Sequence, residues 1–100
     1  MKVNLQSVNF NVDQKLVNFT QFKLNKLENH FNRIIYADVF LKVINTRGKE
    51  NKITEILLSV PGDEFMTKKI NKSFEEGVGE CVTSLERQLR KRKEKLNAHV

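Results

Sequence analysis

The spacing of apolar residues alternates between a strand period and a helix period along this chain, and the order of these periods constrains its fold more than any other feature. Residues 2–8 alternate, with Val3 and Leu5 on one side, which predicts a strand buried on one face. Residues 16–31 then repeat every three or four positions, which predicts a helix capped by Asp13 that runs to about Phe31. Its stripe consists of Leu16, Phe19, Thr20, Leu24, Leu27 and Phe31.

The two-residue period returns over residues 36–44, which are β-branched and aromatic and predict a second strand. Residues 45–51 lack apolar side chains and contain a glycine, so they predict an exposed connection to a third strand over residues 53–60. Pro61, Gly62 and Asp63 form the strongest turn signal and predict a hairpin to a fourth strand over residues 64–70. The residues expected to face the core are Ala37, Val39, Leu41, Val43, Ile56, Leu58, Val60, Phe65 and Thr67.

A second, longer helix is predicted after Ser73, because Ser73 and Glu76 have the spacing of a capping box. Gly77 and Gly79 each disfavour a helix interior by about 1 kcal/mol relative to alanine. They therefore indicate either close packing of this turn against the sheet or local looseness. The expected buried stripe is Phe74, Val78, Val82, Leu85 and Leu89.

The predicted order of elements is strand, helix, three strands, helix. This order predicts an α+β fold, namely a β-α-β-β-β-α two-layer sandwich in which both helices cover one face of a four-stranded sheet. The first two strands are expected to be parallel and the last three to form an antiparallel meander. With 100 residues, the chain has room for one domain, residues 1–100.

Positive charge is concentrated near the C-terminus. Between Arg87 and Lys95 the chain has six Lys or Arg and one Glu, a large part of its formal net charge of +6. On a helical wheel Arg87, Arg90 and Lys91 lie opposite the leucines, whereas Arg92 lies on the buried side and is expected to overhang the end of the sheet. A localised basic face is typical of nucleic-acid binding, although an anionic membrane or an acidic protein also fits.

Phe22, Tyr36 and Phe40 lie outside the expected core stripes. Phe22 lies beside a second basic flank, formed by Lys15, Lys26 and Arg33 on the first helix, and can stack on an exposed base. We interpret it instead as a peripheral core residue. Tyr36 and Phe40 can line the open face of the sheet, but no glycine-rich aromatic signature accompanies them.

The residue pattern does not predict an enzyme, a metal site or a cofactor. His30 and His99 are far apart and lack a cysteine or carboxylate at ligand spacing. Cys81, at the edge of a buried stripe, is expected to be inert. No apolar run is long enough to cross a bilayer, the first residues lack a secretory core, and the single cysteine favours a reducing cytoplasm.

The segment Leu85-Glu86-Arg87-Gln88-Leu89, with Lys91 and Lys93-Glu94-Lys95-Leu96 after it, resembles the C-terminal helix of the ribosome hibernation-promoting factor family, which includes the ribosome-associated inhibitor proteins. The first helix is similar too. It carries Leu16, Phe19, Lys23, Lys26-Leu27-Glu28, Phe31 and Arg33-Ile34. Leu41-Lys42-Val43 resembles the second strand of the family, and Gly62 its hairpin turn. The segment Ser73–Gly77 departs from the family, which has an acidic cap, an aromatic residue and small residues there.

The resemblance implies a fold akin to double-stranded RNA-binding domains. It also implies binding to the small ribosomal subunit between head and body, where messenger and transfer RNA sit. The bound protein would hold idle ribosomes inactive and so inhibit translation in resting cells. Because the chain ends at Val100, it resembles the short form, which lacks the additional C-terminal domain by which long members pair ribosomes. We expect the chain to be a monomer. The residues expected to contact ribosomal RNA are Lys23, Lys26, Arg87, Arg90, Lys91 and Lys95.

Two other hypotheses use the same residues differently. A general double-stranded RNA-binding domain would use the basic helices without preferring ribosomes. A protein-interaction module would use an apolar sheet face around Phe40, with the basic helix only solubilising the chain. Binding that is indifferent to salt would favour the protein-interaction module.

Overall fold

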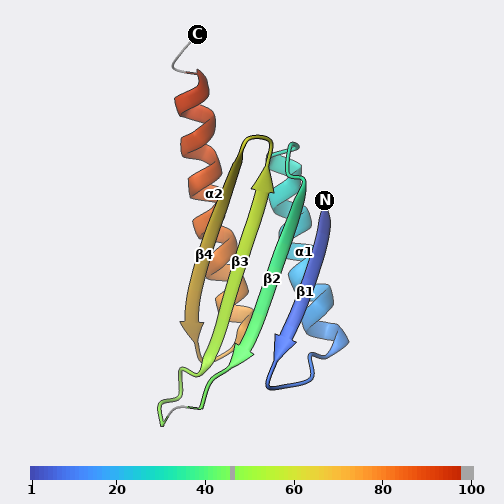
Figure 1. Cartoon of the computed structure of the whole chain (residues 1–100), viewed down its shortest axis with the longest axis vertical. Helices are drawn as coiled ribbons and strands as arrows, with labels where there is room; N and C mark the ends of the chain where they lie inside the picture. Colours follow the sequence, from blue (N-terminus) through green and yellow to red (C-terminus); the bar gives the residue numbers. More distant parts are fainter. Residues whose placement is uncertain (46, 98–100) are drawn as a thin grey trace.

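The sheet has the predicted strands in the order β1-β2-β3-β4 (Figure 1). The computed structural model describes residues 1–45 and 47–97. Strand β1 (Lys2–Val8) is parallel to β2 (Tyr36–Val43), and β3 (Lys52–Val60) and β4 (Asp63–Asn71) continue antiparallel. The predicted topology is therefore confirmed, and each strand bound lies within one residue of its expected position.

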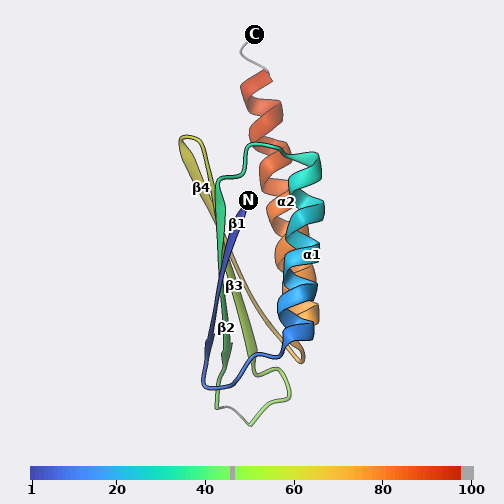
Figure 2. The ribbon, with the colours of Figure 1, turned by 90° about the vertical axis from the view of Figure 1, so that its right-hand side faces the viewer.

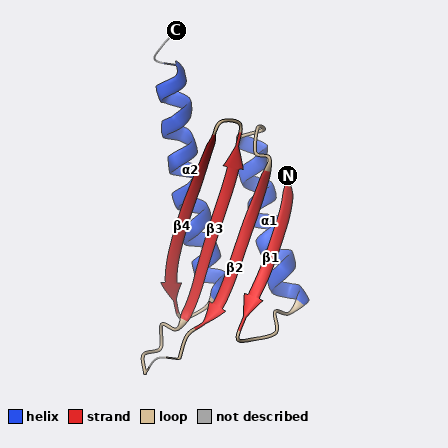
Figure 3. Cartoon of the chain, in the orientation of Figure 1, coloured by secondary structure: helices blue, strands red, loops and turns tan. Residues whose placement is uncertain are grey.

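Helices α1 (Gln14–His30) and α2 (Phe74–Asn97) cover the same face of the sheet (Figure 2), while the other face stays open. They pack against one another, and α2 lies over β3 and β4. Figure 3 shows the two layers, one of helices and one of strands. The predicted two-layer sandwich is confirmed.

Both helices begin where the sequence places a cap. The Leu16 amide donates to Oδ1 of Asp13 at 2.8 Å, and Phe31 is the C-cap of α1. At the start of α2 the Glu76 amide donates to Oγ of Ser73 at 3.2 Å. These side chains satisfy amides that lack a partner inside the helix, and so fix where each helix begins.

The core lies between the helix layer and the covered face of the sheet. Alternate strand residues point into it, and the helical stripes close it from the other side. Phe65 and Val82 reach only its periphery, where they are partly buried. Its fully buried side chains include Leu24, Val39, Leu41, Ile56, Leu58, Val78 and Leu85.

The two glycines of α2 have different roles. A Cβ atom at Gly77 would stand 2.3 Å from Oγ1 of Thr54 and 3.3 Å from Oδ1 of Asn71, so only glycine allows α2 to approach β3 and β4 this closely. A Cβ at Gly79 would meet nothing within 4 Å. Close packing is therefore the explanation for Gly77, and not for Gly79.

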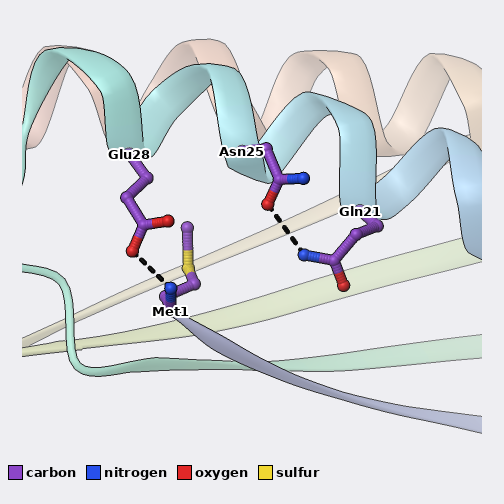
Figure 4. Close-up of polar contacts among 4 residues, drawn as sticks. All are labelled: Met1, Gln21, Asn25 and Glu28. Atoms are coloured by element: carbon purple, nitrogen blue, oxygen red, sulfur yellow. Dashed lines mark hydrogen bonds and ion pairs between the residues drawn. The ribbon is translucent and has the colours of Figure 1, made fainter.

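Strand β1 is joined to α1 by the terminal amine of Met1, which pairs with the carboxylate of Glu28 (Figure 4). On the same helix Nε2 of Gln21 donates to Oδ1 of Asn25 at 2.8 Å. These contacts lie on the side of α1 that faces the β1 edge. The opposite side of α1 is left to face α2.

Two expectations from the helical wheel are wrong. Phe22 is not a peripheral core residue, because 57% of it is exposed. Arg33 is not on α1, because the helix ends at His30 and Arg33 lies in the following turn.

Leu96 belongs to the apolar side of α2 but is 56% exposed, since the helix runs past the end of the sheet (Figure 1). His99 lies outside the described residues.

Candidate nucleic-acid interface

Charge is separated along α2. Its first turn carries Glu75 and Glu76 and its last turn Lys95, an arrangement that suits the helix macrodipole. Because the basic half lies toward the free end of the helix, it is the part of the molecule best placed to meet a polyanion. Its exposed cations are Arg87, Arg90, Lys91, Lys93 and Lys95.

Lys23 of α1 and Arg87 of α2 line the same shallow depression on the surface. Lys69 and Lys72, from the end of β4 and the turn after it, also line it. Sequence reasoning missed these two lysines, because it could not show that the end of β4 lies beside the first half of α2. Charge alone gave no signal for them.

The same depression also has an acidic wall formed by Glu50, Glu75, Glu76 and Glu80. A phosphate there would meet both signs of charge. Phosphate binding is therefore better supported by the second half of α2 than by the depression itself.

Two lysines of α1 lie over aromatic rings. Nζ of Lys26 is 5.2 Å from the ring centroid of Phe22, and Nζ of Lys23 is 5.6 Å from that of Phe19. Such cation–π contacts stabilise exposed sites by about 0.5–1 kcal/mol and leave the ammonium groups charged. Lys26 and Phe22 together present a cation and an aromatic ring on the outer side of α1.

Internal ion pairs neutralise little of the basic surface. Arg90 pairs with Glu86, one turn earlier, at 2.9 Å, but both side chains are solvent-exposed, and such pairs contribute only about 0.3–0.5 kcal/mol. Arg87, Lys91 and Lys95 have no ion pair within the described part of the chain. These three can bind an external anion without first losing a partner.

The basic residues span the width of the helix layer. Lys95 follows Gly77 by about five helical turns, so it lies on the side of α2 that, at Gly77, approaches Thr54 of β3 and Asn71 of β4. Lys91 lies near the same side, whereas Lys23 and Lys26 belong to α1, across α2. Of the six predicted contacts, Lys23 and Arg87 share a depression, and the set as a whole is spread over both helices as a broad basic surface.

Cys81 is fully buried, and its Sγ lies 3.6 Å from the carbonyl oxygen of Thr54. Burial raises the pKa of the Cys81 thiol from 9.0 to about 11. The thiol is therefore protonated and shielded at neutral pH, as expected of an inert cysteine.

Residues 1–45 and 47–97 contain neither a cluster of metal-ligating side chains nor a helix that could cross a membrane. No group of three or more His, Cys, Asp or Glu residues is placed to hold a metal ion. Neither α1 nor α2 is long and apolar enough to cross a membrane.

The fold matches those of two solved structures. A ribosomal subunit interface protein from Coxiella burnetii superposes with a TM-score of 0.83 at 19% identity, over 94% of this chain and 99% of that one. The N-terminal domain of Thermus thermophilus Protein Y superposes with a TM-score of 0.79 at 18% identity, over 91% and 98% of the two chains. At these identities the similarity establishes the fold alone.

The sequence identifies the family. Residues 3–97 match the family described as "Sigma 54 modulation protein / S30EA ribosomal protein", and the chain belongs to it. A Pseudomonas putida protein named ribosome hibernation promoting factor is 30% identical over 95 residues, or 95% of this chain and 89% of that protein. The Escherichia coli K12 protein of that name is 30% identical over 99% of this chain and all of its own length. A Bacillus subtilis relative is 28% identical over 97% of this chain but only 51% of its own length.

Proposed function

We propose that this chain is a bacterial ribosome hibernation factor that binds the small ribosomal subunit and blocks messenger and transfer RNA, which inhibits translation in resting cells. The observation that carries the proposal is that three of the predicted contacts in the second half of α2 are exposed and have no ion pair among the described residues, namely Arg87, Lys91 and Lys95. Lys23, Lys26 and Arg90 extend that set across both helices. Membership of the family and the names of its curated relatives support the same role.

The mechanism is steric and electrostatic and requires no catalytic step. Lysine and arginine side chains that neutralise RNA phosphates release condensed counterions, which drives binding. Arg87 and Arg90 can each grip a phosphate with two nitrogens, whereas Lys91 and Lys95 act as point charges. The monomer acts in the cytoplasm and prevents messenger and transfer RNA from binding by occupying their place.

Competition on purified small subunits tests this function. Labelled chain is sedimented with subunits alone and with subunits already loaded with messenger RNA and transfer RNA. We expect the chain to pellet with empty subunits and to be displaced from loaded ones. Equal binding to both would contradict the proposed blocking.

A general RNA-binding domain is the main alternative, because it would use the same cations. A plain RNA duplex added in excess over ribosomes would then remove the chain from them, whereas a ribosome-specific factor would remain bound.

The open sheet face supports a protein-interaction role. It exposes Val8, Phe40, Met66 and Ile70. Binding through this face would be insensitive to salt, so a salt titration separates it from both RNA-binding functions.

A further inference from the structure

A second pocket lies where α2 runs past the end of the sheet. Its walls are the end of α1 with the turn that follows, the β3–β4 hairpin, and the last turns of α2, which Figure 1 shows meeting at one end of the molecule. Its volume is about 380 Å³, within the range of small-molecule sites. It shares no lining residue with the depression that holds Lys23 and Arg87.

The inside of this end pocket is apolar. Val60 and Leu89 are nearly buried in it, and the ring of Phe31 is partly buried. Leu96 lies two turns after Leu89 on the same side of α2, but no strand lies beneath it, so it stays 56% exposed. The apolar side of α2 therefore continues past the end of the sheet, where Leu96 forms an exposed wall of the pocket.

The rim of the end pocket is cationic. Arg33 and Lys93 line it, and neither has an ion pair among the residues that the structure describes. No carboxylate from residues 1–45 or 47–97 lines it. Arg92 is held in place, because its Nη2 donates to the carbonyl oxygen of Pro61 at 2.8 Å and its Nε lies 3.7 Å from Oδ2 of Asp63. An occupant should therefore be apolar or aromatic in part and negatively charged in part.

We propose that the end pocket takes one unpaired nucleotide of single-stranded RNA. The base enters the apolar space and stacks on the Phe31 ring or the fixed guanidinium plane of Arg92, while its phosphates meet Arg33 and Lys93. Bases splayed out of single strands are recognised in this way, by aromatic rings and arginine planes beside cationic groups. This inference rests on the proposed function only in taking RNA as the ligand.

Nuclear magnetic resonance of the full chain tests the proposal. The probes are hexaadenylate and an abasic hexamer with the same sugars and phosphates. Hexaadenylate is expected to shift the methyl resonances of Val60, Leu89 and Leu96, and the abasic hexamer to leave them unchanged. Equal shifts with both probes, or shifts confined to residues outside the pocket, would overturn the proposal.

Variants give a second test. Leu96→Ala should weaken hexaadenylate binding about five- to tenfold, the lower end of the range for one lost stacked base, because it removes a wall of the pocket without touching the core. Met66→Ala is its control, since Met66 is an equally exposed apolar residue on the open sheet face. Lys93→Ala should weaken binding of hexaadenylate while Lys42→Ala, on the open sheet face, does not. Unchanged affinity in both pocket variants would contradict the inference.

The two proposals can fail separately. Ribosome binding that persists while the end pocket ignores hexaadenylate overturns only the nucleotide site. Hexaadenylate in the pocket of a chain that ignores ribosomes overturns only the proposed function. If an acidic aromatic peptide fills the pocket and hexaadenylate does not, the ligand is protein and the nucleotide proposal is wrong.

Discussion

The two glycines of α2 differ in whether the fold has room for a Cβ atom at their position. Gly77→Ala should lower the free energy of unfolding by about 1–2 kcal/mol, because the new methyl group would overlap Oγ1 of buried Thr54 and the loss exceeds the gain in helix propensity. Gly79→Ala should raise it by up to about 1 kcal/mol, because only the propensity gain applies there. Urea denaturation measures both. Equal stability of the two variants would contradict the close approach at Gly77.

The buried thiol of Cys81 links stability to pH. Its pKa is about 11 in the folded chain against 9.0 as the reference value, so the folded state favours the protonated form. The stabilisation that the protonated Cys81 thiol gives to the folded chain is fully present below pH 9 and is lost between pH 9 and 11. Over that range the free energy of unfolding should fall by about 2–3 kcal/mol.

Other groups also titrate at high pH, so the test compares the slope of the parent chain with that of Cys81→Ala. The variant should show a shallower decline from pH 9 to 11 in urea denaturation at successive pH values. At pH 8 a thiol reagent should modify the parent only after denaturation. Rapid modification of the native chain would show that the thiol is accessible.

At the scale of the element, Arg92 connects the last turns of α2 to the sheet. Arg92 bonds to the β3–β4 hairpin through Pro61 and Asp63, whereas Arg90 pairs only with Glu86 on its own helix. Arg92→Ala should therefore speed hydrogen exchange of the last two turns of α2 several-fold, and Arg90→Ala much less. Mass spectrometry of exchanged peptides measures this. Equal acceleration would mean that the hairpin contact does not hold the helix.

Sequence periodicity predicted the elements because each one buries one side. Alternation in residues 36–43 and the three-to-four spacing after Asp13 and Ser73 leave only one arrangement that covers every apolar stripe. The wheel could not place Phe22, because it does not show how far a neighbouring helix extends. The end of α1 near Phe31 was predicted to within one residue, so counting Arg33 on the same wheel extended the helical pattern past the predicted end of the helix.

The site was predicted only in part. The exposure of the basic half of α2 could be predicted from the sequence, because six cations in one segment cannot all face a core. The acidic wall of the depression and the lysines at the end of β4 depend on tertiary neighbours. The end pocket could have been expected from the lengths of α2 and β4. The 24 residues of α2 span about 36 Å and the nine residues of β4 about 30 Å, so the helix must run past the end of the sheet.

At the scale of the whole molecule, binding should depend steeply on salt. Six phosphate contacts predict a slope of about −4 to −5 for log K against log salt concentration. Replacing Lys91 by alanine should flatten the slope by about 1 and weaken binding uniformly across RNA sequences. A slope near zero would favour the open sheet face as the binding surface.

The most direct test reverses the charge of the second half of α2. A variant with Arg87→Glu, Arg90→Glu and Lys91→Glu is compared with one carrying Lys2→Glu, Lys42→Glu and Lys49→Glu, which changes net charge equally but at residues that lie outside both helices. Circular dichroism should show both folded. In co-sedimentation with small ribosomal subunits, we expect the control to pellet like the parent and the α2 variant to stay in the supernatant. An α2 variant that pellets fully would contradict the assignment of this surface to ribosome binding.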